Sequence, residues 1–328
     1  MLLSIAIPAY NAERSLERTV RSVLAQTHRD LEVLVVNNGS VDGTGDLAKC
    51  LAKEDDRIKV FDVYPNVGGY GARLYAWRRA KGDYIATADA DDVIEPDMYE
   101  QMIALAVRSD LDVVECDWVE GMASPSPAKE PPDVYETKEE VFEKVVYPTF
   151  VSIGKSAYTW NKIYRNQYDF SEWEEGDFGS YEDLIHNLQL FRPVKNYGHI
   201  HAGFYHYMPS DSSVTRNFSL GRLNQFSNAI KVKRRLVGAY GIKPDDCVLD
   251  HWVLNDARNA LASAVVCNTD VRKAEIVHQV FAMRDVADAF VRLRKIKEKS
   301  VVYRQMSLAA HLPSWLVVVM LKLARKFM

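Results

Sequence analysis

Short apolar runs alternate with helical patterns along the first part of the chain. The runs are rich in β-branched residues and bounded by turns, as is typical of buried strands. They lie at 2–7, 31–36, 58–63 and 84–88, and the helical patterns between them lie at 12–26, 44–53 and 69–80. Such a strand–helix alternation predicts a parallel sheet covered by helices on both faces.

Polar clusters follow the predicted strands at their carboxyl ends. They are Pro8-Ala9-Tyr10-Asn11, Asn37-Asn38-Gly39-Ser40, residues 64–69 and Asp89-Ala90-Asp91-Asp92. Because open α/β sheets bind their ligands at the carboxyl ends of the strands, we expect all four clusters on one rim of the sheet.

The tetrad at 89–92 places three carboxylates within four residues. Carboxylates this close repel one another unless a proton or a cation relieves them, and hard cations such as Mg2+ and Mn2+ prefer oxygen ligands. The tetrad therefore predicts a divalent cation site shared with substrate phosphates. The alternative is an acidic turn in which Asp92 caps the next helix.

The C-terminal third shows helical periodicity without strand-like runs. The pattern covers about 218–237 and 250–290, and a basic cluster follows at 292–299. This region is predicted to be a helical appendage.

The last segment, 312–328, is too short in apolar residues to span a bilayer. Trp315, an aliphatic stretch, and Lys322, Arg325 and Lys326 are typical of a helix that lies in a membrane interface. The alternative is a terminal helix packed on its own domain or on a second subunit, as in a homodimer.

Composition limits the classes of function. The net charge of -4 argues against a nucleic-acid-binding protein that relies on a basic surface. The four cysteines are widely spaced without a CxxC pair, which favours reduced thiols in a cytosolic protein. Because the chain opens directly into an apolar strand, we expect no signal peptide. The expected location is the cytoplasm, with peripheral contact to the inner face of the membrane through the last segment.

Five motifs occur in an order that resembles the family 2 glycosyltransferases of the GT-A fold. They lie at 4–11, 34–44, 66–73, 81–85 and 89–92. The resemblance is tight over about the first third of the chain and looser to about Thr215. It implies an α/β fold with a Rossmann-like, mostly parallel central sheet flanked by helices, and a C-terminal helical extension.

The resemblance also implies a division of the chain into domains. A glycosyltransferase domain is expected over 1–215, and a helical region over 216–328. Within the first, residues 1–120 would bind the nucleotide sugar and residues 121–215 the acceptor.

The family's D-x-D motif maps onto the tetrad. The resemblance implies that Asp91 is the principal ligand of Mn2+ or Mg2+ and that Asp89 contacts the ribose or the metal, with Asp92 as a spare carboxylate. The cation would stabilise the departing nucleoside diphosphate.

Two further segments match donor-binding positions of the family. Pro8, Ala9 and Tyr10 resemble its nucleoside-binding edge, with an ordinary strand-ending turn as the alternative. Arg73 matches an arginine near the diphosphate or base, and its alternative is a solvated helix arginine.

Asn37 and Asn38 depart from the family pattern, which commonly has two aspartates there. One of those carboxylates accepts the N3–H of uracil. An asparagine oxygen can accept the same bond without charge assistance. UDP is therefore the favoured nucleotide, and dTDP and GDP stay open.

The resemblance places the general base in an acidic pair that begins a helix. Asp183 is the expected base and Glu182 the fallback, and the alternative is a pair of N-terminal helix acids stabilised by the macrodipole. Trp160 would stack on a sugar or pack in the core. Asp117 would lie near the donor sugar or be an ordinary loop acid.

A histidine-rich segment, 199–207, alternates in a way that predicts an edge-like strand. A zinc site in this histidine cluster, His199, His201 and His206, is an alternative that no nearby cysteine supports. His206 is a candidate contact to the donor diphosphate or the cation.

The expected function is therefore inverting, metal-dependent transfer of a sugar from a nucleoside diphosphate to a hydroxyl of a saccharide or lipid-linked acceptor, in surface polysaccharide or glycan synthesis. Nucleic acid is not an expected partner. A catalytically impaired homologue that only binds sugar nucleotides is the alternative.

Overall fold

A computed structural model describes residues 1–123, 130–151, 157–209, 221–243, 246–267, 273–296, 300–312 and 317. The chain forms two compact units. The first unit contains the sheet and comprises Met1–Val145, Ala157–Asp177 and Glu182–Ser210. The second is helical, and its described parts come from 146–151, 178–181 and the residues after 220.

The parallel part of the sheet is built from the four predicted apolar runs. These strands are β1 (Leu3–Ala9), β2 (Leu31–Asn38), β3 (Ile58–Val63) and β4 (Tyr84–Thr87), in the spatial order β3-β2-β1-β4. All three pairings are parallel. The prediction of a parallel sheet is confirmed. Strands β1, β2 and β4 are buried on both faces because most of their residues are apolar, whereas β3 at the edge is largely half-buried.

The second half of the sheet is mixed. Its strands are β8 (Lys162–Arg165), β6 (Val113–Glu120), β9 (Tyr197–Tyr207), β5 (Val93–Ile94) and β7 (Asp133–Tyr135). Strand β8 lies antiparallel between β4 and β6, and β9 runs parallel to β6. The prediction that 199–207 form an edge strand is wrong, because β9 also pairs with β5 and β7.

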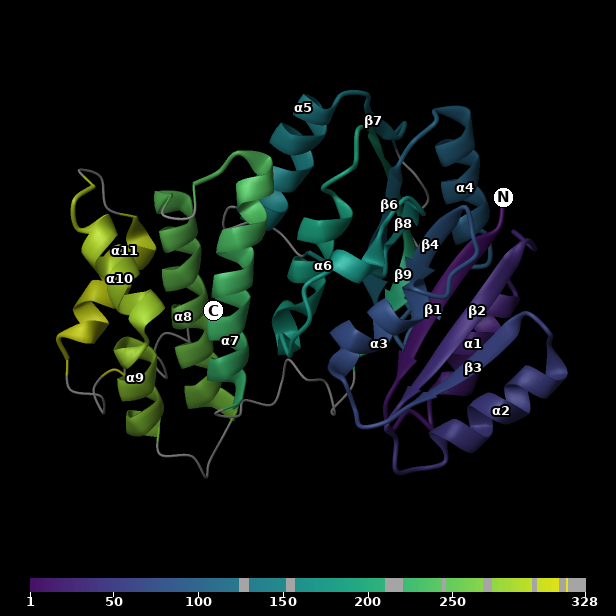
Figure 1. Cartoon of the computed structure of the whole chain (residues 1–328), viewed down its shortest axis with the longest axis horizontal. Helices are drawn as coiled ribbons and strands as arrows, with labels where there is room; N and C mark the ends of the chain where they lie inside the picture. Colours follow the sequence, from purple (N-terminus) through teal and green to yellow (C-terminus); the bar gives the residue numbers. More distant parts are fainter. Residues whose placement is uncertain are drawn as a thin grey trace. The chain divides into compact units, whose positions relative to one another are not determined.

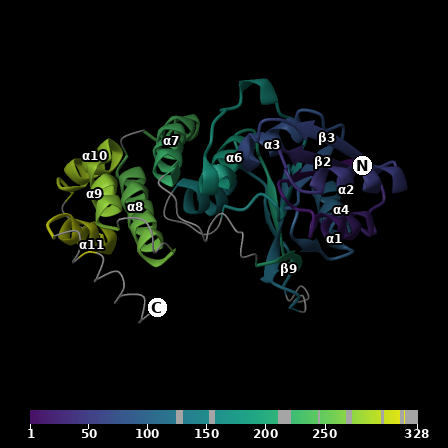
Figure 2. The same cartoon turned by 90° about the horizontal axis from the view of Figure 1, so that it is seen from below.

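Helices cover both faces of the sheet (Figure 1, Figure 2). Helices α1 (Leu16–Leu24), α2 (Thr44–Glu54) and α4 (Met98–Arg108) pack their apolar positions into the main core cluster with β1, β2 and β4. Helix α3 (Gly68–Trp77) packs on β1 and β2 and contacts α6 (Glu182–Leu190). The first helix begins later than predicted, at Leu16, after a turn in which Ser15 N–H donates to the Ala12 carbonyl.

Short helical segments connect these elements. They are α5 (Lys138–Val141), the π-helix η1 (Phe142–Val151), and the 3-10 turns η2 (Phe170–Glu172) and η3 (Gly179–Tyr181). Helix α5 begins with a capping box in which Thr137 accepts from the Glu140 N–H and the Glu140 carboxylate accepts from the Thr137 N–H.

The helical unit confirms the predicted C-terminal appendage. It contains α7 (Gly221–Leu236), η4 (Val237–Tyr240), α8 (Cys247–Cys267), α9 (Lys273–Ala282), α10 (Arg284–Leu293) and α11 (Val301–Ala310). The fully buried Asp250 of α8 accepts from Arg234 at 2.6 Å and from Arg292 at 2.7 Å. Part of the predicted basic cluster is therefore an internal ion pair that joins α7, α8 and α10.

Two expectations concern residues that the structure hardly describes. The domain boundary at 215/216 lies outside the described residues and stays a prediction. The interfacial segment 312–328 is described only at Leu312 and Val317, so it also stays a prediction. Among the described helices, none combines the length and the apolar character needed to cross a bilayer. Cys50, Cys116 and Cys247 are free thiols.

Candidate active site

The carboxyl ends of β1, β2 and β4 bring the predicted polar clusters to one rim. Ala9 is paired with Asn37, and the Ala88 N–H that ends β4 donates to the Ala6 carbonyl. The pairing of β1 with β4 ends at Ala6. Pro8 lies beyond this point, so β4 offers no acceptor for the backbone N–H that proline lacks, and proline is tolerated inside β1.

Arg73 is the centre of a carboxylate cluster on this rim. It lies on α3 and is 3% exposed. Its guanidinium donates to Asp89 at 2.7 Å and to Glu182 at 2.6 Å, and lies 3.6 Å from Asp183. Burial lowers the pKa of Arg73, but the three carboxylates outweigh this and raise it well above its ordinary value. The solvated alternative for Arg73 is therefore wrong.

Glu182 is held by both of its oxygens. Oε1 accepts from Arg73, and Oε2 accepts from the Tyr70 backbone N–H at 2.8 Å. A Cβ at Gly69 would lie 2.6 Å from Oε1, so glycine is needed for this close approach. Burial raises the pKa of Glu182, although Arg73 opposes the shift. Glu182 thus fixes the start of α6 against the start of α3.

Asp183 is less constrained than Glu182. Its Oδ1 accepts from the Thr159 hydroxyl at 2.7 Å, and no other hydrogen bond to its carboxylate comes from the part of the chain that the structure describes. Burial raises the pKa of Asp183 against the opposing effect of Arg73. A partly buried carboxylate with a raised pKa and a free oxygen has the properties of a general base.

Asp91 and Asp92 have different environments although they are adjacent. Burial, together with the charge of Asp89, raises the pKa of Asp91 to about 6. Arg18 reaches this residue but donates to its backbone carbonyl, at 2.6 Å, and not to its carboxylate. The Asp91 carboxylate is therefore the less satisfied of the two.

Asp92 is fully buried and serves the fold. Its carboxylate accepts from the Tyr205 hydroxyl and from the Met208 N–H, each at 2.7 Å, and burial raises its pKa to about 8. The alternative that Asp92 caps the next helix is wrong. It precedes β5, and Asp97 occupies the N-cap position of α4.

The predicted nucleoside edge presents one side chain and one stretch of backbone. Tyr10 is 54% exposed, whereas Ala9 is fully buried and Pro8 is partly buried. An aromatic ring is thus available for stacking at this end of β1, while Ala9 can contribute only backbone groups.

Asn37 and Asn38 have distinct roles in the structure. Asn37 donates its amide N–H to Asp62 at 2.8 Å, and its buried Oδ1 has no partner among the described residues. Asn38 instead donates to Asn66 and Gly68 and accepts from the Val67 N–H. Asn38 therefore holds the loop after β3, and Asn37 keeps an acceptor available.

Asp62 was missed by the sequence analysis. It lies beside Asn37 in the register of β2 and β3 and also pairs with Lys49 at 2.9 Å. The parallel register of two adjacent predicted strands was the signal that could have found it.

Aromatic side chains cluster beside the tetrad. Trp160 is 2% exposed and is stacked between Tyr205 and Tyr158, so it belongs to the core and not to a sugar-stacking surface. Trp118 packs edge-on against Trp160 and Tyr158 and is 36% exposed. Trp118, which the sequence analysis did not single out, is the more accessible ring.

His206 and Asp117 are both engaged by other side chains or backbone. The two ring nitrogens of His206 contact the Gly121 carbonyl and the Glu95 carboxylate, and the residue is 2% exposed. Asp117 contacts His199 at 2.9 Å. Of the predicted site residues, the structure thus brings together Arg73, Asp89, Glu182 and Asp183, and gives His206 a structural contact.

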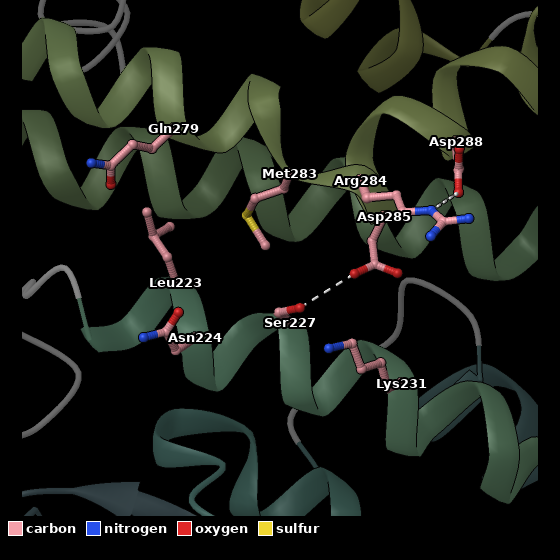
Figure 3. A pocket seen from close by; sticks show the side chains of 9 residues that line it. All are labelled: Leu223, Asn224, Ser227, Lys231, Gln279, Met283, Arg284, Asp285 and Asp288. Atoms are coloured by element: carbon pink, nitrogen blue, oxygen red, sulfur yellow. Dashed lines mark hydrogen bonds and ion pairs between the residues drawn. The ribbon is translucent and has the colours of Figure 1, made fainter.

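The helical unit contains a separate pocket of about 630 Å³ between α7, α9 and α10 (Figure 3). Two polar pairs on its wall satisfy each other, Ser227 with Asp285 at 3.4 Å and Arg284 with Asp288 at 3.7 Å. Its other lining residues are Leu223, Asn224, Lys231, Gln279 and Met283. None of the predicted site residues lines it.

Known proteins are similar to this chain in both sequence and fold. The family model described as glycosyl transferase family 2 matches residues 4–179. A Bacillus subtilis (strain 168) protein named uncharacterized glycosyltransferase EpsJ is 30% identical over 221 residues, which are 65% of this chain and 63% of that protein. The putative teichuronic acid biosynthesis glycosyltransferase TuaG of the same organism is 40% identical over 102 residues, 31% of this chain and 40% of that protein.

The match to these curated relatives spans less than two thirds of their length. Among solved structures, S. aureus TarS 1-349 in complex with UDP-GlcNAc is similar with a TM-score of 0.58 and 14% identity, covering 89% of this chain and 90% of that chain. At this identity the similarity establishes the fold, and the predicted GT-A fold is confirmed.

Proposed function

This chain belongs to glycosyl transferase family 2, and on that premise we propose that it is an inverting, metal-dependent glycosyltransferase. It transfers one sugar from a nucleoside diphosphate, UDP in preference, to a hydroxyl of a saccharide or lipid-linked acceptor. The observation that carries the proposal is the arrangement of Asp89, Glu182 and Asp183 around Arg73, because it joins the donor rim to the expected base.

Asp183 is proposed to accept the proton of the acceptor hydroxyl. Inversion requires a base on the side of the sugar opposite the departing diphosphate. The raised pKa of Asp183 favours proton acceptance, and Thr159 orients the carboxylate through one oxygen. Both carboxylate oxygens of Glu182 accept hydrogen bonds, one from Arg73 and one from the Tyr70 N–H. Glu182 therefore positions the base without replacing it.

The residues of the tetrad fit a hard divalent cation. Asp91 would be the principal ligand, because its carboxylate feels the charge of Asp89 and has a raised pKa. Asp89 would share in binding while one oxygen stays with Arg73. A bound Mn2+ or Mg2+ would supply electrostatic stabilisation of the charge on the diphosphate leaving group.

The donor base is proposed to lie between Tyr10 and Asn37. The unpartnered Oδ1 of Asn37 suits the N3–H of uracil, because its amide N–H is already directed at Asp62. TarS, whose structure contains UDP-GlcNAc, supports UDP as the nucleotide. The name of TuaG, a putative teichuronic acid biosynthesis glycosyltransferase, supports a role in surface polysaccharide synthesis.

The test is a panel of nucleotide sugars with and without Mn2+, with release of the nucleoside diphosphate as readout. We expect UDP-sugar turnover that needs the metal, is lost in Asp91→Ala and is kept in the matched control Asp97→Ala. Full activity of Asp91→Ala would refute the metal assignment, and a preference for GDP would refute the uracil assignment. Binding of a UDP-sugar without turnover on any acceptor would favour the alternative of a catalytically impaired homologue.

Membrane contact through 312–328 is part of the proposal for a lipid-linked acceptor. Deletion of these residues should abolish co-sedimentation with anionic liposomes. Unchanged lipid binding would remove the membrane contact and leave packing on the domain or a second subunit.

A further inference from the structure

A cluster of metal-ligating side chains lies outside the carboxylate cluster of the rim. Asp117 of β6 and His199 and His201 of β9 each offer one ligand atom, and the three atoms lie within 4.8 Å of one another. The His199 Nε2 is 2.9 Å from the Asp117 Oδ1, and the two imidazole centroids are 4.5 Å apart. The three side chains therefore converge on a single point.

The backbone explains this convergence. His199 and His201 are two residues apart on β9 and point to the same face. The pairing of β6 with β9 shifts in register on both sides of Asp117, so that Cys116 pairs with Ile200 but Asp117 pairs with Gly203. The extra residues lie on β9, where His201 falls between the two paired positions and stays beside Asp117.

We propose that Asp117, His199 and His201 bind a borderline transition-metal ion, with Zn2+ as the expected metal. Two imidazoles and one carboxylate form a ligand set that suits Zn2+, whereas the carboxylates of the rim suit Mg2+ or Mn2+. Zinc–nitrogen and zinc–oxygen bonds of about 2.0–2.2 Å place tetrahedral ligand atoms about 3.3 Å apart. Small side-chain movements from the observed distances reach that geometry.

The surroundings favour a cation. His201 Nε2 also lies 3.1 Å from Asp133 of β7, which can act as a fourth ligand or hold the imidazole in place. Glu115, two residues before Asp117, adds negative charge but is paired with Lys162 at 3.3 Å. The side chains of His199 and His201 are 23% and 27% exposed, so an ion can reach them from solvent.

The bound ion would join β9 to β6 and β7, two strands that precede it by more than 60 residues. Strands β6, β7 and β9 lie side by side in the sheet (Figure 1). Trp118 follows Asp117 directly on β6, so the metal would also hold the stretch of backbone that carries this accessible ring. The site would therefore stabilise the sheet and position one surface beside the tetrad.

The test uses the full chain, stripped with a chelator and titrated with Zn2+ by calorimetry, with the metal content measured after desalting. We expect one zinc per chain and a rise in Tm of several degrees. The double variant His199→Ala/His201→Ala should lose affinity by more than the roughly 10–100-fold that loss of an outer partner costs. The matched control His278→Ala/His311→Ala removes two exposed histidines from α9 and the end of α11 and should bind zinc like the natural chain.

A second readout separates this site from the rim. Asp91→Ala should keep the zinc stoichiometry and affinity, and Co2+ in place of Zn2+ should give an absorption spectrum of nitrogen and oxygen ligation that Asp117→Asn alters. The proposal is overturned if the His199→Ala/His201→Ala chain binds zinc as tightly as the natural chain, or if the natural chain retains no zinc. In either case the contacts are ordinary histidine–carboxylate pairs.

Discussion

Two pairs of acidic residues, Glu182 with Asp183 and Asp91 with Asp92, lie on the rim of the sheet. They differ in the source of the positive charge that compensates them. Glu182 and Asp183 face Arg73, a buried cation that belongs to the chain. Asp91 and Asp92 have no comparable partner among the described residues, since Arg18 contacts only the backbone of Asp91. The first pair shares one internal positive charge, whereas the second depends on protons or a cation from solution.

This difference separates two tasks that carboxylates perform. An internal arginine fixes its partners and opposes the rise in pKa that burial causes, which suits positioning and proton transfer. A carboxylate group without such a partner can take up and release a divalent ion together with the substrate. Asp89 belongs to both groups, because it pairs with Arg73 and raises the pKa of Asp91.

Substitution of the proposed base should have the largest effect. Asp183→Asn keeps the size of the side chain and its contact with Thr159 but cannot accept a proton. We expect kcat to fall by about 10²–10⁴-fold with little change in the KM of the donor. In the natural chain, kcat should rise with pH through a pKa above the ordinary range of aspartate, because burial raises it.

Glu182→Gln is the matched control for this experiment, one residue away and with the same change of group. It should reduce kcat less than Asp183→Asn and should lower thermal stability, because Arg73 loses one charged partner. A variant Asp183→Asn that retains most of its turnover would transfer the role of base to another residue.

Removal of the positive charge of Arg73 should destabilise the fold. Arg73→Met leaves three carboxylates around an apolar side chain, and breaking a buried ion pair in this way costs about 3–5 kcal/mol. Chemical denaturation would measure the change, with Arg79→Met, an exposed arginine just after the end of α3, as the control. Equal unfolding midpoints for the two variants would contradict the central role of Arg73.

The carboxylates of Asp91 and Asp92, which pair with no cationic side chain in the described part of the chain, should make the free energy of unfolding depend on pH. The folded-state pKa values of Asp91 and Asp92, about 6 and about 8, lie above the value of about 3.9 in unfolded chains, so the folded state binds more protons between these limits. Their contribution is fully present below about pH 4 and is lost as the pH rises to about 8, by at most about 1.4 kcal/mol per pH unit for each group.

Denaturation with urea at a series of pH values tests this sign. Asp91→Asn should flatten the decline between about pH 4 and 6, and Mn2+ at neutral pH should stabilise the natural chain but not this variant. An unaltered decline in Asp91→Asn would assign the titration to other groups.

The smallest expected effect concerns the nucleotide edge. Asn37→Asp would place a second carboxylate against Asp62, where the natural side chains are 2.8 Å apart, and should weaken UDP binding about tenfold or less. The double variant Asn37→Asp/Asp62→Asn exchanges the two groups and should restore binding. Calorimetry with UDP would measure both, and equal affinity of the two variants would contradict the coupling.

Local pattern was sufficient to predict one half of the sheet. Strands β1 to β4 are short apolar runs separated by helices, and each strand is paired with a neighbour in the parallel order that this pattern favours. The other half depends on contacts that spacing does not encode. Strand β8 is four residues long and enters between β4 and β6, which its own sequence does not show.

The same limit applies to the site. The strand-end residues Asp89, Asn37 and Tyr10 could be placed on a rim, because carboxyl ends of parallel strands share an edge. The contact of Arg73 with Glu182 joins residues 109 positions apart, and only the fold reveals it. Asp117 and His199 were noticed separately, but the pairing of β6 with β9 that brings them together joins segments about 80 residues apart.

The close approach at Gly69 bears on how this enzyme family can be recombined. Because Glu182 reaches across to the Tyr70 N–H and to Arg73, segments around 66–73 and 180–183 have to be exchanged together. A chimera that takes residues 121–215, the proposed acceptor-binding half, from a relative should keep both sides of this contact from one parent. Such a hybrid could acquire a new acceptor while the donor rim stays as it is.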